Sequence, residues 1–180
     1  MYWSVWLVRP THHEYNNAMS PEDEVCRALD ELGIPYTRVD HPPVYTVAQA
    51  RPYAIYRGEV HVKNLFLRSR KGDRYYLLVV PETRAVDLKA LAARLGEKRL
   101  GLASPERLGS ILGVEPGAVG PFGLLNDAAR QVVVLLDASL PAAHSAGFHP
   151  NVNTATLVIS GADLLKFLQH AAARVELLTF

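Results

Sequence analysis

A lysine interrupts one of the most apolar stretches of the chain, "VHVKNLFLR" (60–68). In a β-strand, side chains alternate between the two faces, so Lys63 shares a face with Leu65 and Leu67 while Asn64 falls on the other. An ammonium group is costly to bury without a partner. A lysine at this position therefore needs a specific explanation.

Three explanations fit Lys63. The side chain extends from an edge strand into solvent and discourages edge pairing, or it belongs to a buried structural ion pair. Alternatively, it is a functional cation that interacts with an anionic or charge-developing group of a ligand. Use as a general base would require a lysine pKa far below the ordinary ~10.4. The strand alone leaves these explanations open.

The other reactive side chains do not form a familiar catalytic pattern. The sequence has no G-x-S-x-G elbow, no H-E-x-x-H pair, no phosphate loop ending in Gly-Lys-Ser/Thr and no G-x-G-x-x-G after a strand. None of the seven histidines has an acidic partner at helical spacing, so we expect no metal and no cofactor. His41 and His149 each precede a proline on an expected loop, and Cys26 is expected to pack beside the apolar stripe of the first helix.

Composition limits the class of protein. The 180 residues are 49% hydrophobic and 21% charged with a net charge of +1, which suits one globular domain and confines any nucleic-acid site to a local patch. Cys26 is the only cysteine, which excludes an internal disulfide and favours a cytoplasmic protein. No apolar run approaches the ~20 residues of a membrane span. "MYWSVWLV" is short and lacks a preceding basic region, so we expect no signal peptide.

Caps and turns divide the chain into elements. Residues 1–19 read as an N-terminal extension and residues 20–180 as the domain, because "MSPEDEV" resembles a natural start. Helices are expected after Ser20, from Val47, after Asp87, between Ser104 and Gly113, and at 161–172. Strands are expected at 60–68 and 74–81, joined as a hairpin, and at 131–137, 153–160 and 175–180. This mixture without a regular repeat predicts a single compact α+β domain around a mixed sheet.

Four segments in one order resemble the YbaK/prolyl-tRNA synthetase-associated domain family. They are "HPPVYTVAQA" (41–50), "HVKNLFLR" (61–68), "GVEPGAVGPFGLLND" (113–127) and "GFHPNVNTATLVIS" (147–160), and the resemblance runs from about Ser20 to Ala173. Within the family, "PGAVGPFG" and "HPNVNTAT" are similar to the free-standing proteins that hydrolyse Ala-tRNA(Pro). The resemblance implies a barrel-like mixed sheet with surrounding helices, and the aminoacylated 3′ end of a tRNA as substrate.

The resemblance also implies the site. Lys63 stands at the position of the family's functional lysine and His149 at that of its pocket histidine, so these two are the candidate catalytic residues. Backbone N–H groups of residues 115–118 are expected to hold the carbonyl oxygen or amino group of the substrate. The candidate substrate-binding residues are Thr46, Asn64, Gly113, Pro116, Gly117, Ala118, Phe122 and Asn151. Ordinary turn roles for His149 and for the glycines remain the alternative.

The chemistry agrees with this set of residues. Prolyl-tRNA synthetase cannot strongly exclude alanine, because a missing methylene contributes only ~1–3 kcal/mol of discrimination. A second site that admits alanine and not proline corrects the error by size. An aminoacyl ester is already activated, so its hydrolysis needs no protein nucleophile. The expected partner is tRNA(Pro) charged with alanine, with transient contacts to prolyl-tRNA synthetase or an elongation factor.

Basic residues provide a candidate path for the tRNA backbone. Arg68, Arg70, Lys71 and Arg74 gather at the expected hairpin turn, where they contact phosphates or simply remain solvated. Other functions stay open beside Ala-tRNA(Pro) hydrolysis. They are deacylation of Cys-tRNA(Pro) or another aminoacyl-tRNA, non-catalytic binding of tRNA or an aminoacyl group, and sensing of a free amino acid.

Overall fold

A computed structural model describes residues 19–43 and 60–180 of the chain. The helix predicted from Val47 and the candidate residue Thr46 lie outside the described residues, as does the N-terminal extension up to residue 18. Within the described ranges, no helix has the length and apolar character needed to span a bilayer.

Helices begin where the sequence places capping residues. The Ser20 hydroxyl accepts a hydrogen bond from the Asp23 amide at the start of α1 (Pro21–Glu31), and Ser160 caps α5 (Gly161–Ala171) in the same way. Asp87 accepts two amide hydrogen bonds at the start of α3 (Leu88–Arg94). These three predicted helices are confirmed.

The helix predicted between Ser104 and Gly113 changes its hydrogen bonding part-way. It begins as α4 (Pro105–Arg107) and continues as a π-helical turn (Leu108–Leu112). Gly113 ends it with φ 63°, in the left-handed region that favours glycine. Short 3₁₀ helices follow at Pro121–Asn126 and Leu140–Ala142.

The strands form two sheets. The larger has the order β4 (Leu100–Leu102), β2 (Val62–Ser69), β3 (Tyr75–Pro81), β5 (Val132–Asp137) and β8 (Arg174–Leu178). β4, β2 and β3 pair antiparallel, whereas β3, β5 and β8 pair parallel, so this sheet is mixed as predicted. The smaller sheet is antiparallel, with β7 (Ala155–Ile159) between β1 (Thr37–Asp40) and β6 (Ala146–Phe148).

The barrel-like closure expected from the resemblance is wrong. Closure requires a continuous ladder of strands, and in the described residues the only backbone pairing toward the smaller sheet is the single bridge from Val60 to Ala146 of β6. The chain then leaves this contact and enters β2 of the larger sheet. Residues 60–64 therefore lie where the backbone passes from one sheet to the other.

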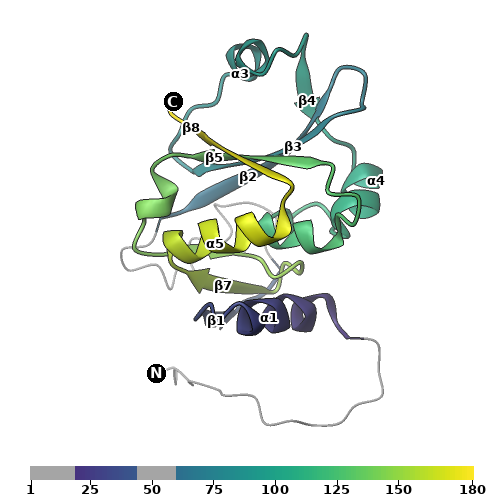
Figure 1. The fold of residues 1–180 in the computed structure, drawn as a ribbon. Coiled ribbons are helices and arrows are strands. Elements are labelled where there is room, and N and C mark those ends of the chain that lie inside the picture. The colour runs from purple at the N-terminus through teal and green to yellow at the C-terminus, as the bar shows by residue number, and fades with distance from the viewer. Residues whose placement is uncertain (1–18, 44–59) are drawn as a thin grey trace.

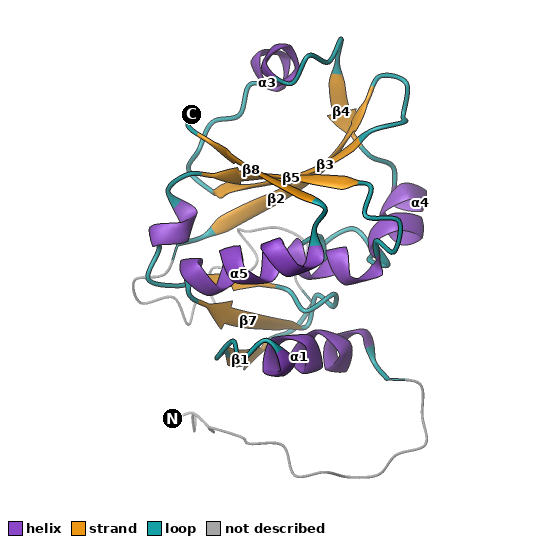
Figure 2. Ribbon diagram, in the orientation of Figure 1, coloured by secondary structure: helices purple, strands orange, loops and turns teal. Residues whose placement is uncertain are grey.

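The larger sheet separates two hydrophobic cores (Figures 1 and 2). α5 lies between the two sheets, α1 flanks the smaller sheet, and α3 lies beyond the larger sheet. The main core fills the space around α5 and includes Phe66, Phe122, Phe148, Leu157 and Phe167. The second core lies between α3 and the opposite face of the larger sheet, and includes Leu67, Leu78, Leu91 and Leu178.

Candidate functional site

Strand β2 sends two candidate residues to opposite faces. Leu67, and Leu65 beside it, pack in the second core, so the Lys63 side chain starts on that face. Phe66 packs in the main core, which places Asn64 on the other face. The alternation predicted from the sequence is confirmed, and the ammonium of Lys63 leaves the strand away from Asn64.

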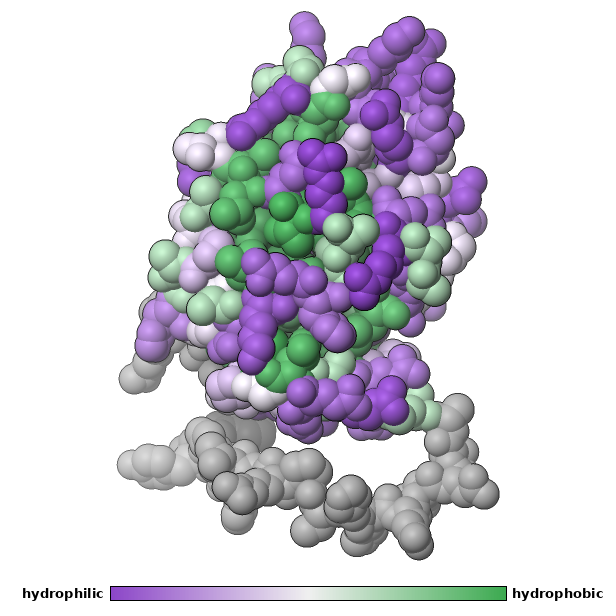
Figure 3. All heavy atoms as spheres, in the orientation of Figure 1, coloured by the Kyte–Doolittle hydropathy of each residue, from purple (hydrophilic) through white to green (hydrophobic). Residues whose placement is uncertain are grey.

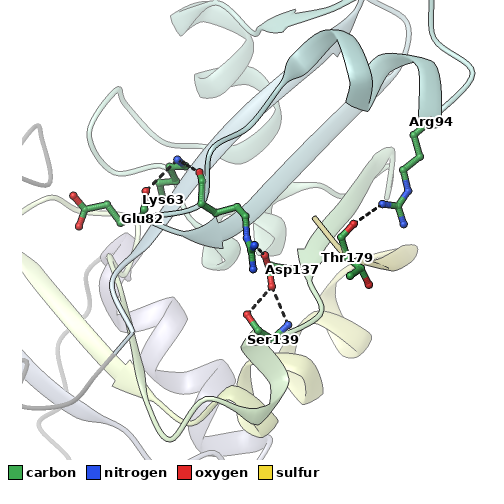
Figure 4. Close-up of polar contacts among 7 residues, drawn as sticks. Lys63, Glu82, Arg94, Asp137, Ser139 and Thr179 are labelled. Carbon is green, nitrogen blue, oxygen red and sulfur yellow. Dashed lines mark hydrogen bonds and ion pairs between the residues drawn. The ribbon is translucent and has the colours of Figure 1, made fainter.

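The Lys63 ammonium is bound by the main chain of the turn after β3. Nζ donates to the carbonyl oxygen of Glu82 at 3.1 Å and makes a short hydrogen bond to that of Arg84 (Figure 4). Among the described residues, no carboxylate lies within ion-pair distance of this ammonium. The contacts therefore favour neither a structural ion pair nor a side chain that simply extends into solvent.

His149 follows β6 and fixes the position of the glycine-rich loop. Its Nδ1 lies 2.9 Å from the carbonyl oxygen of Gly117. Because a carbonyl oxygen only accepts, Nδ1 carries the proton, and Nε2 is an acceptor in the neutral ring. Burial lowers the pKa of His149 and the neighbouring His41 lowers it further, while the Gly117 contact acts in the opposite direction. The ring is therefore neutral at pH 7.

His41 and Thr156 belong to the same cluster, and neither was among the predicted site residues. The ring centroids of His41 and His149 are 5.5 Å apart, and His41 Nε2 lies 3.0 Å from Thr156 Oγ1. The pairing of β1 with β7 brings them together across most of the chain. The repeated His-Pro dipeptide was the only sequence signal that linked His41 to His149.

The loop 113–120 approaches both β2 and His149. A Cβ atom added to Gly120 would lie 3.7 Å from the His149 carbonyl oxygen and 3.9 Å from Asn64 Nδ2. Gly117 has φ 99°, so its conformation also favours glycine. The predicted residues Asn64, Gly117 and His149 are thus brought together by three separate segments.

Two amide oxygens at this site are buried without a hydrogen-bond partner among the described residues. They are Oδ1 of Asn64 and Oδ1 of Asn151. Asn151 also has φ 61°, a strained value for a residue other than glycine, and its Nδ2 contacts the carbonyl oxygen of Phe122 at 3.4 Å. Each of these buried oxygens can accept a hydrogen bond from a donor group of a ligand.

The remaining predicted substrate residues have different environments. Phe122 is fully buried, with edge-to-face contacts to Phe148 and Phe167, so its ring supports the site from within the core. Ala118 is buried as well, whereas Gly113 and Pro116 are exposed.

The predicted tRNA-binding residues lie at the other end of β2. All four are exposed, and Arg74 pairs with Glu97 at 2.8 Å. β4 pairs with β2 from Leu67 to Ser69, which brings Lys98 and Arg99 to the same end. This basic end is about 20 Å from Lys63 along the strand.

Comparisons with known proteins assign the family. The aminoacyl-tRNA editing domain matches residues 41–167. This range contains the whole clustered site, which is the set His41, Asn64, Gly117, Gly120, His149, Asn151 and Thr156. This chain belongs to the aminoacyl-tRNA editing domain family. Membership confirms the predicted class of enzyme, an aminoacyl-tRNA hydrolase.

Individual relatives of this editing protein cover nearly all of it. Prolyl-tRNA editing protein ProX of Acetoanaerobium sticklandii is 41% identical over 151 residues, which are 84% of this chain and 92% of ProX. Prolyl-tRNA synthetase associated domain-containing protein 1 of Danio rerio is 36% identical over 179 residues, with 97% of each chain covered. The Danio match therefore extends into residues 1–19.

Solved structures share the fold of this editing protein. The crystal structure of hypothetical protein APE2540 has a TM-score of 0.67 at 19% identity, and covers 85% of this chain and 97% of its own. A candidate trans-editing enzyme for prolyl tRNA synthetase has a TM-score of 0.65 at 22% identity, with 89% and 98% covered. The single mixed α+β domain predicted from sequence is thereby confirmed.

Proposed function

We propose that this protein hydrolyses alanine from mischarged Ala-tRNA(Pro) in trans. The observation that carries the proposal is the convergence of Asn64, the 117–120 backbone and His149 inside the range that matches the editing family. The resemblance of ProX, a prolyl-tRNA editing protein, supports proline tRNA as the carrier. The alanine preference rests on the segments "PGAVGPFG" and "HPNVNTAT".

The clustered site supplies acceptors and donors of the kind that an aminoacyl ester requires. The unpartnered amide oxygens of Asn64 and Asn151 are acceptors suited to the substrate's ammonium group. Nε2 of neutral His149 is an acceptor that orients the attacking water or a ribose hydroxyl. In the 115–118 segment, the N–H groups of Glu115 and Gly117 stabilise the negative charge that develops on the ester oxygen. Pro116 has no N–H, and the Ala118 amide donates to the Glu115 carbonyl oxygen at 3.0 Å.

Lys63 provides a positive charge on the face of β2 opposite Asn64, at a part of the strand that has only one neighbouring strand. β4 covers β2 only from Leu67 onward, so among the described residues β2 pairs on one side alone at Lys63. A nucleotide that passes this edge reaches both Lys63 and Asn64. In the proposed complex, the ammonium binds the terminal phosphate or ribose while Asn64 faces the aminoacyl group.

The basic end of β2 gives the tRNA a second contact. Arg68, Arg70 and Lys71 are exposed there and bind phosphates of the acceptor region, whereas Arg74 is already engaged by Glu97. The separation of about 20 Å from Lys63 matches a substrate that extends along the strand.

Deacylation of tRNA(Pro) charged separately with alanine, cysteine, serine and proline tests the proposal. We expect alanine to be released fastest, proline to be spared, and the rates to persist with a chelator. Equal rates for alanine and proline would remove the size discrimination, and fastest release of cysteine would assign the other branch of the family. Binding of the charged tRNA without hydrolysis would indicate a non-catalytic tRNA-binding protein. Activity that is lost with chelator and restored by zinc would exclude the metal-free reaction.

A further inference from the structure

The turn that follows β3 holds the Lys63 ammonium through its main chain. The Arg84 amide donates to the Pro81 carbonyl oxygen at 2.9 Å, and the Glu82 amide donates to the His61 carbonyl oxygen at 2.7 Å. The carbonyl oxygens of Glu82 and Arg84 are thereby directed at Nζ of Lys63. The position of the ammonium therefore depends on how firmly this turn is held.

Arg84 ties the turn to the end of β5. Its Nε lies 2.9 Å from Oδ2 of Asp137, whose side chain is only 3% exposed (Figure 4). The other oxygen of Asp137 accepts from the amide and the hydroxyl of Ser139, at 2.9 and 2.6 Å. A buried carboxylate requires a countercharge, and Arg84 is its ion-pair partner among the described residues.

The charge of Asp137 is secured by its surroundings. Burial alone would raise its pKa, but the hydrogen bonds from Ser139 and the positive charge of Arg84 outweigh that effect and lower it. Asp137 is therefore an anion at neutral pH, so its ion pair with Arg84 is present at that pH.

The guanidinium of Arg84 is also held from another side. Its carbon lies 5.9 Å from the centroid of the Phe180 ring, a cation–π contact. Figure 3 shows hydrophobic surface gathered around β8, where Leu177 and Phe180 are exposed. The Arg84 side chain is thus fixed between a buried anion and an aromatic ring.

We propose that Arg84 is a positioning residue for Lys63, because its ion pair with Asp137 fixes the turn whose carbonyl oxygens orient the ammonium. Two of the three ammonium N–H groups are committed to this turn, which leaves one with a set direction for an anionic group such as a phosphate. The effect on catalysis rests on the proposed function. The orientation of the ammonium is a property of the folded protein and does not depend on it.

Trace acylation of lysines and single-turnover deacylation, on the same full-length variants, test this role. Acylation of Lys63 is followed by mass spectrometry, with the exposed Lys71 and Lys98 as internal references. Arg84→Ala and Asp137→Asn break the ion pair, whereas Arg84→Lys keeps a positive charge. The matched control is Arg94→Ala, because Arg94 is an exposed arginine that donates only to the Thr179 carbonyl oxygen nearby (Figure 4).

We expect Arg84→Ala and Asp137→Asn to raise the relative acylation rate of Lys63 about threefold or more and to lower the saturated deacylation rate about tenfold, with KM little changed. Both rates should be intermediate in Arg84→Lys, between those of the two ion-pair variants and those of the wild type. In Arg94→Ala both rates should equal those of the wild type. If Arg84→Ala does not fold, Asp137→Asn and Arg84→Lys decide the question.

Unchanged acylation of Lys63 in the folded ion-pair variants would overturn the positioning role, as would an equal change in Arg94→Ala. A wild-type protein that does not deacylate Ala-tRNA(Pro) would instead refute the proposed function. In that case the acylation rates alone still decide whether Arg84 positions Lys63.

Discussion

Lys63 and Asn64 are consecutive on β2, and their side chains leave the strand on opposite faces. Asn64 faces the loop and His149, while the ammonium of Lys63 turns to the carbonyl oxygens of Glu82 and Arg84. One short segment therefore supplies an amide to the clustered site and a cation to the edge beside it. A substrate that passes around this edge can contact both residues.

Replacement of Lys63 by methionine should remove activity and leave the fold. We expect the single-turnover rate to fall about a hundredfold or more, because the cation that holds the terminal phosphate or ribose in place is lost. Glu82 and Arg84 are half-buried, so we expect water to replace the ammonium at their carbonyl oxygens and the stability loss to stay below about 2 kcal/mol. Lys63→Arg should also be poor, because a planar guanidinium does not replace a compact ammonium.

Thermal melts and deacylation of these variants are compared with Lys89→Met, which changes an exposed lysine on α3. A Lys63→Met protein that is badly destabilised but retains near wild-type turnover would show that the lysine is structural.

Substitution of Gly117 by alanine should disturb the loop at its contact with His149. The φ of 99° is strained for alanine, at a cost of about 1–3 kcal/mol, and relaxation of the loop would move the carbonyl oxygen away from the imidazole. We expect a lower deacylation rate together with a lower melting temperature. Gly109→Ala is the control, because a Cβ there meets open space. Equal effects of both substitutions would mean that the Gly117 conformation has no special role.

Stability should fall on acidification because of His149. Its pKa is lowered in the folded state, so below the unfolded pKa of about 6.5 the unfolded chain binds more protons. The contribution of His149 is therefore fully present above that pH and is lost as pH falls toward its folded pKa. Urea unfolding at about pH 7.5 and about pH 5.5 measures this change. His149→Gln should reduce the pH dependence and His144→Gln, at an exposed site, should not. If the unfolding free energy changed equally with pH in the wild type and both variants, His149 would not be the source of the pH dependence.

Removal of the hairpin charges should weaken tRNA binding without affecting chemistry. Arg70→Ala with Lys71→Ala deletes two exposed charges, and the slope of log K against log salt should fall by about 1.5 if both contact phosphates. The rate at saturating substrate should change little. Arg27→Ala with Lys166→Ala removes two exposed charges from α1 and α5 as a control. An unchanged affinity and slope in the hairpin variant would identify these residues as a solvated turn.

Deletion of residues 1–18 is expected to leave fold and deacylation nearly intact. Ser20 caps α1 by its own hydroxyl, so the helix start does not require the preceding segment. Melting temperature and single-turnover rate of the shortened protein check this prediction. A large fall in melting temperature would show that the tryptophan-containing segment packs against the domain.

Local signals in the sequence predicted the elements well. Ser20, Asp87 and Ser160 accept hydrogen bonds from amides within three residues, and the β2–β3 hairpin closes across a short turn. Each of these features therefore depends on residues that are close in the sequence. β4 and β6 were missed because each has three residues, too few for a periodic pattern. The π-helical turn at 108–112 has no separate sequence signal, because its residues read as an ordinary helix.

The candidate site was only partly predictable for the same reason. The resemblance placed Asn64, Gly117 and His149, and the structure brings these together. His41 joined them only through the pairing of β1 with β7, which no local pattern specifies. The direction of the Lys63 ammonium was likewise unforeseen, because it depends on the turn after β3.

The contact between His41 and Thr156 spans 115 residues of sequence, and this has a consequence for the order of folding. Closure of so long a loop carries a large entropy cost, whereas the β2–β3 hairpin closes across a few residues. The smaller sheet should therefore assemble late and exchange its amide hydrogens first. In mild denaturant, the histidine pair would separate while the larger sheet persists, so an ordered protein without a working site becomes the first partially unfolded state.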